Sequence, residues 1–455
     1  MLKSSIKSLI ILGAIMAMSA CSGSPSLNPT SFNNSHVPLS NASKLLRSPE
    51  GLDHSYTYEE YSDPEYKEFK NKLSIFSHKI ADAYVKSSFA EDKNITISPF
   101  SIEMCLGLAI RSTNNNTRKE ILDAMGVDYA TFNKYYKLLF NEMQFTRYGD
   151  NNDIMSQLLI TNSIWIGDEI ELKDDALDAL RDDYYCYSYQ SDFNDKNKKS
   201  CEDIQKFIYE KTKGLLNPTI ELDIRTLFVL MNTLYLKDVW NEAAHDLAYT
   251  NMDVHFTNYD QSVSTKPLLE GGYREGKIIE TDNYSSFYTT TNTAFSIHFV
   301  KPKGGKRIQE VFNEETMSYV TDRKNYVTQD DEKLERYHTK CIFPEYTADG
   351  DIELKNMLGN TFSIKTLFEE TKCDFSSITD RDAFVMSVRH IAKLKVDKKG
   401  IEGAAVTLMV AGATGMPDQT YTDVYDTFVA DKEFGFILTS GDTVLFSGIV
   451  TNIDK

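Results

Sequence analysis

The chain has 455 residues and a formal net charge of -18, with 41% hydrophobic and 25% charged residues. It contains no Lys/Arg-rich run long enough to form a phosphate-binding face, which excludes nucleic acid as a partner. Residues 66–455 contain no Pro/Ser-rich linker and no internal repeat that would divide them, so we expect one large domain there.

The N-terminus resembles a bacterial lipoprotein signal. Basic residues precede an apolar run over 9–18, and Ser19 and Ala20 stand directly before Cys21. The run is too short for a permanent membrane span, and it has no polar second face, which argues against an N-terminal core helix. We therefore expect a signal peptide over 1–20, lipid attachment at Cys21, and a position on the bacterial envelope, at the outer membrane, facing the periplasm or the outside.

The segment after the signal is rich in Ser, Asn and Pro and poor in aliphatic residues. Such a composition predicts a flexible tether, here over residues 21–65. Apolar residues then recur at helical spacing over 65–88 and predict the first helix of the domain. Residues 94–98 predict a short strand that runs into another helix, with Pro99 at a favourable first position.

Further elements follow along the chain. Thr117 and Glu120 have the spacing of a capping box, which predicts the start of a helix that Gly126 ends. Strands are predicted at 157–166, 226–236, 293–300 and 384–397, with a helix at 201–213. Because strands and helices alternate without a regular βαβ rhythm, we expect a mixed α+β fold.

The cysteines other than Cys21 do not indicate a metal site or a disulfide framework. They are odd in number and contain no C-x-x-C pair. We expect most of them to be small buried residues, with a single disulfide as the alternative. These residues are Cys105, Cys186, Cys201, Cys341 and Cys373. No metal and no cofactor is expected.

Residues 390–410 are the most informative stretch of the chain. From Gly400 the sequence alternates as a strand does, and the residues on one face are all small or apolar. That face consists of Ile401, Gly403, Ala405, Thr407 and Met409. Such a segment could enter a sheet without burying a charge. Residues 411–418 follow with the Gly, Pro and Asp of an exposed turn.

Several further segments form recognisable motifs. They are N-I-T-I-S-P-F-S-I (94–102), N-T-R-K-E-I-L-D-A-M-G (116–126), N-S-I-W (162–165), T-L-F-V-L-M-N-T-L-Y-L-K (226–237) with Trp240, F-V-A-D-K-E-F (428–434) and L-F-S-G (445–448). These motifs, in this order and from about residue 66 to the end, resemble those of the serpins, the serine-protease-inhibitor family. The spacing from His390 to Gly400 and the small residues after it resemble the serpin hinge.

The resemblance implies a central, mostly antiparallel sheet, further sheets, surrounding helices and an exposed reactive loop at about 398–427. A protease would cut this loop and be trapped as an acyl-enzyme when the loop enters the central sheet. The implied hinge residues are Gly400, Ile401, Glu402, Gly403, Ala404, Ala405, Val406 and Thr407. The implied sheet-opening residues are Ser98, Ser101, Asn232 and His390, with Trp240 at the top of the gap.

The bait bond is placed by the loop length of the family. Counting from Gly400 gives Thr414-Gly415, with Ala413 and Met416 as alternatives, whereas counting back from Phe428 gives Thr420-Tyr421. The hinge-side count sets how far the protease is moved, so we favour Thr414. The small residues here, and the absence of Lys and Arg between 400 and 431, favour an elastase-like protease as partner.

The sequence also departs from the family pattern. Lys398 replaces the usual Glu, Ile401 the usual Thr or Ser, and Gly403 the usual Ala. Asp238 stands for a usual Gly, and Glu433 for a usual Pro. These changes concern the efficiency of loop insertion more than the fold.

An enzyme is not expected, because the chain lacks G-x-S-x-G, H-E-x-x-H and a Gly-rich phosphate loop. The expected function is that of a monomeric protease inhibitor, held at the membrane only by its lipid. One alternative is a non-inhibitory, serpin-like binding protein. Another is a glycan-binding lipoprotein of the outer membrane, which would leave the hinge without a purpose.

Overall fold

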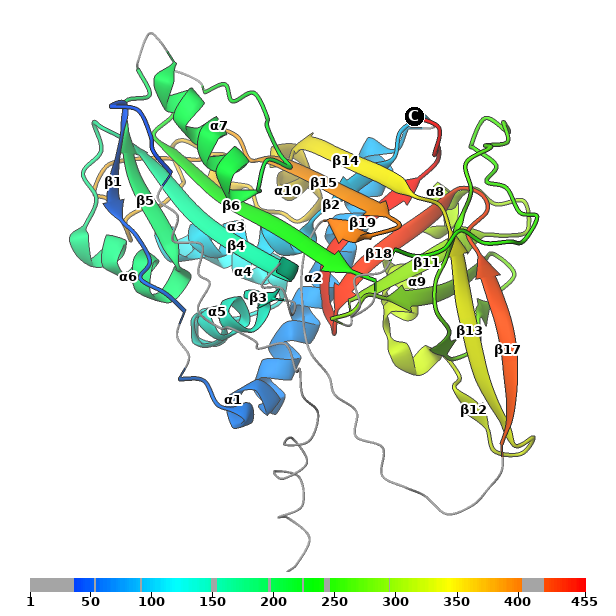
Figure 1. Cartoon of the computed structure of the whole chain (residues 1–455). Coiled ribbons are helices and arrows are strands. Elements are labelled where there is room, and N and C mark those ends of the chain that lie inside the picture. Colours follow the sequence, from blue (N-terminus) through cyan, green and yellow to red (C-terminus); the bar gives the residue numbers. More distant parts are fainter. Residues whose placement is uncertain are drawn as a thin grey trace, which may run out of the picture.

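The architecture is mixed α+β, as predicted, with one large sheet, a smaller sheet and helices packed against them (Figure 1). The computed structural model describes residues 37–52, 55–90, 92–148, 154–194, 198–222, 225–240, 246–293, 295–402 and 421–455. None of the helices in these ranges is long and apolar enough to cross a membrane.

The large sheet passes through the whole molecule. Its strand order is β1 (Ser43–Arg47), β5 (Cys186–Ser191), β4 (Ile154–Gly167), β6 (Phe228–Val239), β16 (Gly400–Glu402), β15 (Arg389–Asp397), β14 (Tyr346–Glu353), β2 (Ile95–Ile97), β19 (Thr443–Val450), β18 (Phe434–Ser440), β11 (Ser296–Pro302), β10 (Tyr284–Thr290) and β9 (Ile279–Glu280). β3 (Phe145–Tyr148) pairs with β4. Most neighbouring pairs are antiparallel, as expected; β4–β5 and β14–β2 are parallel.

The smaller sheet lies at the opposite end of the molecule from β1 (Figure 1). Its central strand is β13 (Glu335–Phe343), with β12 (Gln329–Asp330) and β17 (Thr422–Val429) beside it. β7 (Leu269–Glu270) and β8 (Arg274–Glu275) pair with β13 as well. β17 begins one residue after the described chain resumes at Tyr421, so this sheet receives the C-terminal end of the predicted loop.

The helices cover both faces of the large sheet. They are α1 (Tyr58–Ser62), α2 (Pro64–Ser88), α3 (Pro99–Ser112), α4 (Asn115–Met125), α5 (Tyr129–Met143), α6 (Asp174–Tyr184), α7 (Lys199–Lys211), α8 (Ile308–Val311), α9 (Glu314–Thr321) and α10 (Lys355–Thr361). α3 begins as the sequence predicts, because Ser98 caps it and Pro99 occupies its first position. Gly126 ends α4 in the left-handed conformation, at φ 70°.

The other predicted elements also form, with boundaries shifted by a few residues. α2 and β4 cover the predicted helix and the first predicted strand, and α7 covers the predicted helix at 201–213. β6, β11 and β15 account for the remaining strands. The last of these begins at Arg389, so residues 384–388 are not part of it.

The predicted capping box of Thr117 and Glu120 does not form, so this prediction is wrong. Both residues lie inside α4, whose N-cap is Asn114. The Thr117 hydroxyl accepts a hydrogen bond from the Asp374 backbone at 3.1 Å, and the Glu120 carboxylate accepts one from the Thr366 backbone at 2.7 Å. The two side chains therefore satisfy a distant segment instead of their own helix.

The flexible tether predicted over 21–65 is wrong in its C-terminal part. Residues 43–47 form β1, which pairs with β5, and α1 follows before α2 begins. Ser40 donates two hydrogen bonds to the Asp203 carboxylate on α7, each of 2.7 Å. Val37 is buried, at 2% exposure. The segment from residue 37 onward is thus attached to the domain, while residues 1–36, including Cys21, lie outside the described part.

The cysteines of the described chain are all free, so the disulfide alternative is not realised among them. Cys186 and Cys341 are buried, and the other three are half-buried. Burial raises the pKa of the Cys105 thiol to about 12. Burial also raises the pKa of the other four thiols. All five are therefore protonated at neutral pH and poor nucleophiles.

Candidate functional site: a gap in the large sheet

A gap separates β6 from β15 in the middle of the large sheet. β6 pairs with β4 along one edge from Phe228 to Lys237. On its other edge, among the described residues, only Asp238 and Val239 have a strand partner, the short β16. β15 likewise pairs with β14 on its far side and with β16 only over its last three residues. From β16 toward Phe228 of β6 and Arg389 of β15, no strand of the described chain lies between the two facing edges.

The hinge predicted from the sequence occupies one end of this gap. Asp397 and Gly400 pair across a tight turn, so the chain leaves β15 and re-enters the sheet as β16. Gly400 lies opposite Val239 and Ile401 opposite Asp238. Ile401 is 2% exposed, which agrees with its predicted inward face. Tyr235 of β6 donates a hydrogen bond of 3.0 Å to the Glu402 carboxylate.

Glycine at position 400 is required by close packing. A Cβ atom on this residue would lie 1.9 Å from the carbonyl oxygen of Asp238 and 3.1 Å from the Cα of Val239. Both of these atoms belong to the backbone of β6 and have no freedom to move aside. Gly400 therefore fixes how closely the hinge approaches the strand beside the gap.

A cavity of about 290 Å³ lies in the gap beyond β16. Residues 226–231, at and just before the start of β6, line one wall, and residues 384–389 line the other. Cys105 and Leu106 of α3 and Ile204 and Ile208 of α7 enclose it between the walls. The lining is largely apolar, so a strand that enters here would bury small or apolar side chains at little cost.

A second, smaller cavity of about 80 Å³ lies in the same gap, and four of the predicted sheet-opening residues line it. The Ser101 hydroxyl donates to the Asn232 side-chain oxygen at 2.7 Å. The Ser98 backbone N–H donates to Nε2 of His390 at 3.1 Å. The structure thus brings Ser98, Ser101, Asn232 and His390 together between α3, β6 and β15.

The cluster depends on a neutral histidine. Burial lowers the pKa of His390 to about 4. Nε2 must keep its lone pair in order to accept the bond from Ser98, and the low pKa allows this at neutral pH. The imidazole therefore serves as a hydrogen-bond acceptor rather than as a charge.

The cluster extends to residues for which the sequence indicated no role. The Asn232 amide donates to the Asn162 side-chain oxygen at 2.9 Å. Asn162 in turn donates to the Tyr136 hydroxyl and to the Tyr184 carbonyl. Asn162 belongs to a recognised motif, but its partners come from α5 and α6, and only the fold brings these elements together.

Trp240 lies at the hinge end of the gap and makes none of these cluster contacts. Its Nε1 donates to the Asp397 carbonyl at 2.6 Å, and its ring packs against Phe343 at 5.5 Å between centroids. It therefore joins the end of β6 to the turn that leads from β15 into β16.

The departures from the family pattern have structural partners. Lys398 forms an ion pair of 2.9 Å with Asp246. Glu433 is buried, pairs with Arg307 at 2.8 Å and accepts a bond from the Ile308 backbone. Ile401 is buried in β16, as described above. The Asp238 carboxylate is buried and accepts hydrogen bonds from the Ser156 and Thr293 hydroxyls, and burial raises its pKa.

The rest of the predicted loop lies outside the described residues. This applies to the hinge positions Gly403, Ala404, Ala405, Val406 and Thr407, and to Ala413, Thr414, Gly415, Met416 and Thr420 of the bait region. In the part of the chain that is described, no cluster of three or more His, Cys, Asp or Glu residues could hold a metal.

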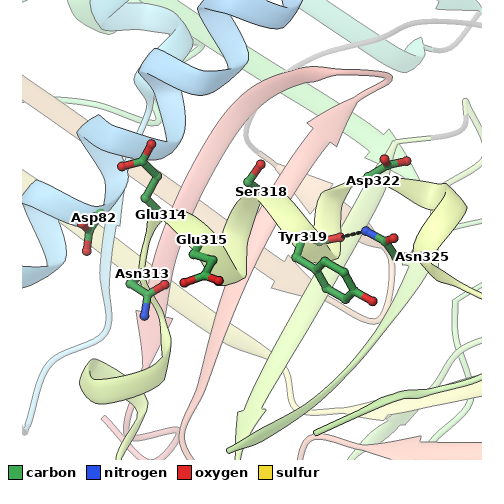
Figure 2. Close-up of a pocket in the computed structure, with 8 residues that line it drawn as sticks. All are labelled: Asp82, Asn313, Glu314, Glu315, Ser318, Tyr319, Asp322 and Asn325. Atoms are coloured by element: carbon green, nitrogen blue, oxygen red, sulfur yellow. Dashed lines mark hydrogen bonds between the residues drawn. The ribbon is translucent and has the colours of Figure 1, made fainter.

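A separate hollow of about 630 Å³ lies outside the gap, beside α9, and is lined by acidic side chains (Figure 2). Glu314, Glu315, Asp322 and Asp82 line it, and Asn325 donates a bond of 2.7 Å to the Tyr319 carbonyl. None of the hinge or cluster residues reaches it. Its carboxylate lining is unsuited to an apolar strand, so the gap between β6 and β15 remains the candidate site.

Together, the fold and the site define a mixed α+β protein whose large sheet, in the described part of the chain, has a gap beside the turn that leads into β16. A family model described as Serpin (serine protease inhibitor) matches residues 71–453. The chain therefore belongs to the serpin family, whose members are in general protease inhibitors rather than catalytic enzymes. An uncharacterised serpin-like protein of Methanosarcina acetivorans is 26% identical over 372 residues, covering 79% of this chain and 81% of that protein.

Solved serpin structures have the same fold. The thermophilic serpin tengpin in its native state superposes with a TM-score of 0.65 at 18% identity, covering 90% of this chain and 100% of that one. Human thyroxine-binding globulin, in complex with its ligand, gives 0.66 at 17% identity, covering 86% and 99%. The predicted serpin fold is confirmed, and the second structure shows that the fold also serves a binding protein.

Proposed function

We propose that this protein inhibits a protease as a suicide substrate, by inserting its cut loop into the gap between β6 and β15. The observation that carries the proposal is β16, a hinge paired with both strands at one end of a gap that no other described strand fills. Insertion would supply hydrogen-bond partners to the two facing edges and bury the apolar face of the loop. These gains offset the lost conformational entropy of the loop.

The register of β16 supports the proposal. Ile401 pairs with Asp238 and, on the other side, with Val396. If both registers continue past β16, each further loop residue pairs with the preceding residue on β6 and on β15. Thr407 then comes to lie opposite both Asn232 and His390. The central hinge residue would therefore meet the cluster that closes the gap, and its hydroxyl could join the cluster's hydrogen bonds.

The bait bond fits the length of the gap. On the same register Thr414 reaches Arg225, just past the start of β6 at Phe228. An inserted strand from residue 401 to 414 would span roughly 45 Å at 3.3 Å per residue. A protease attached to Thr414 would thus be moved from the hinge end of the sheet to its opposite end.

The chemistry is that of an interrupted peptide hydrolysis. The catalytic hydroxyl or thiol of the protease attacks the Thr414 carbonyl, the bond to Gly415 breaks, and the Gly415 amine leaves with a proton. Insertion must then occur before water hydrolyses the acyl bond. The small residues at 411–415 fit a protease with a shallow, elastase-like primary pocket.

We also propose that a lipid on Cys21 holds the monomeric protein at the bacterial outer membrane. The support is the signal-like sequence before Cys21. A Cys21→Ser variant should leave the membrane fraction, and unchanged association would contradict this proposal.

The decisive experiment mixes the intact protein with pancreatic elastase and analyses the mixture by denaturing electrophoresis. We expect a covalent complex with the parent protein and a cut after Thr414. A Thr407→Arg variant would have to bury an unpaired charge beside His390, so insertion should slow and the variant should be cut without trapping the protease. A Tyr425→Arg variant, altered on an exposed strand outside the gap, is the matched control and should trap normally.

A non-inhibitory binding role is the second candidate, and the bulky Ile401 at the hinge and the fold shared with thyroxine-binding globulin support it. The two functions differ in one measurement. Cleavage within 411–421 should raise the melting temperature by tens of degrees if the loop inserts, because many hydrogen bonds and buried side chains form together. An unchanged melting temperature after cleavage would favour the binding role.

A further inference from the structure

Two exposed tyrosine rings meet on the smaller sheet, outside the gap. Tyr273, in the turn between β7 and β8, is 45% exposed, and Tyr425 on β17 is 61% exposed. The rings contact each other edge to face, with 5.1 Å between centroids and 74° between planes. β8 and β17 pair with β13 from opposite sides, so the two tyrosines converge over that strand. Exposed apolar groups that gather in this way mark interaction sites.

The face of the sheet that carries these rings points outward. Tyr337 and Thr339 of β13 are buried at 3% and 1% exposure, whereas His338 between them is partly exposed. His338 is the register partner of Tyr425 and stacks on its ring at 5.2 Å. Because side chains alternate along a strand, Asp423 shares this face with Tyr425. The outer face thus combines aromatic rings with hydrogen-bonding groups.

The polar groups around the rings are paired with one another. Nε2 of His338 lies 2.9 Å from the Asp423 carboxylate, and Lys340 forms an ion pair of 2.7 Å with Glu270. The Lys340 ammonium is also 5.7 Å from the centroid of the Tyr273 ring. The whole chain carries a net charge of -18, but here each carboxylate has a basic partner. The face therefore offers donors and acceptors without the single-sign field that would select a charged partner.

A neutral polysaccharide has the complementary chemistry. The C–H groups on one side of a sugar ring pack on an aromatic face, and its hydroxyls both donate and accept hydrogen bonds. Tyrosine supplies such contact area at a low cost in conformational entropy. A third ring, that of Tyr421, lies 5.5 Å from the Arg336 guanidinium and about 13 Å before Tyr425 along the strand direction. The rings thus extend along β17 and favour a chain of sugars over a single one.

We propose that this aromatic face, formed by Tyr273, Tyr421, Tyr425, His338 and Asp423, binds a neutral polysaccharide. The face belongs to the smaller sheet, whereas the gap lies in the large sheet, so the inference does not rest on protease inhibition. Glycan binding and inhibition can therefore occur in one chain. Binding here would hold the inhibitor on surfaces that carry such a polysaccharide.

The test titrates the full-length protein in a calorimeter with three neutral oligosaccharides: maltohexaose, cellohexaose and mannohexaose. We expect at least one of them to bind, and Tyr273→Ala and Tyr425→Ala each to weaken that binding at least about tenfold. Tyr425→Phe keeps the ring and should stay within about threefold of the parent. Tyr58→Ala is the matched control and should bind as the parent does, because Tyr58 is 84% exposed but lies on α1, away from the smaller sheet (Figure 1).

Several results would overturn the proposal. These are binding of none of the three oligosaccharides, tighter binding of the polyanion heparin than of any of them, and an equal loss of binding in Tyr58→Ala and Tyr425→Ala. If Tyr425→Ala keeps the sugar but traps elastase more slowly than the parent, the face contacts the protease and the proposal is wrong. Tyr425→Arg should lose the sugar while it still traps elastase, which separates this site from the inhibitory function.

Discussion

A Cβ atom placed on Gly400 would come within 1.9 Å of the carbonyl oxygen of Asp238. Gly400→Ala should therefore displace β16 from β6 and expose the Ile401 side chain. We expect the backbone amides of 401 and 402 to lose most of their protection in hydrogen exchange. Gly359→Ala is the control, because the nearest atom to an added Cβ there is at an ordinary 3.7 Å. Unchanged protection in Gly400→Ala would show that the sheet adjusts around the hinge.

The lowered pKa of His390 predicts that the folded protein loses stability in acid. Burial lowers its pKa from 6.5 to about 4, so the unfolded chain binds a proton that the folded protein does not. Stability is therefore lost as the pH falls from 6.5 to about 4, by on the order of 3 kcal/mol for this residue. His390→Gln has no imidazole, so it lacks this pH-dependent loss. The unfolding free energy of the parent minus that of His390→Gln, measured by urea unfolding, should therefore decrease by on the order of 3 kcal/mol between pH 7 and pH 4.

Ser101→Ala is the control for that measurement, since it removes a hydrogen bond of the same cluster but no titratable side chain. Its difference from the parent should change with pH much less than that of His390→Gln. A constant difference for His390→Gln would mean that the cluster accommodates a charged imidazole.

Glu103 predicts the opposite dependence. It is buried between α2 and α3, where it accepts a hydrogen bond of 2.6 Å from the Ser77 hydroxyl, and burial raises its pKa from 4.5 to about 8. The folded protein therefore holds a proton that the unfolded chain releases, and stability falls as the pH rises from 4.5 to 8. Glu103→Gln should be more stable than the parent at pH 7, by on the order of 3 kcal/mol. A variant less stable than the parent at pH 8 would show that the carboxylate has a required ionised role.

Asp203 holds the N-terminal segment on α7. Removing its carboxylate in Asp203→Ala breaks both bonds to Ser40, and we expect a loss of roughly 1–3 kcal/mol and rapid proteolysis within 37–47. Glu202→Ala changes the neighbouring exposed carboxylate and should leave both properties unchanged. Equal proteolysis of parent and Asp203→Ala would mean that β1 alone fixes the segment.

The sequence predicted what depends on local pattern. The helix over 65–88, the helix start at Pro99 and the Gly126 end follow from spacing and residue type, and the serpin motifs supplied the hinge and the cluster around His390. The partners of Thr117 and Glu120 lie about 250 residues away, so the local capping pattern was misleading. β1 has no alternating pattern of its own, and only its pairing with β5 makes it a strand. The hydrogen bond from the Thr293 hydroxyl to Asp238 joins the turn between β10 and β11 to the end of β6, and no sequence motif predicts that these two segments meet.

β1 also bears on how the protein avoids self-association. The outer edge of a large sheet exposes unpaired backbone groups, which other chains can use as a template for fibre growth. Here the outermost strand is only five residues long, carries Lys44 and Arg47, and has an irregular register between Leu45 and Arg47. Short, charged and irregular edges pair poorly with one another. A segment whose composition resembles a linker thereby protects the side of the molecule from which the chain enters the domain.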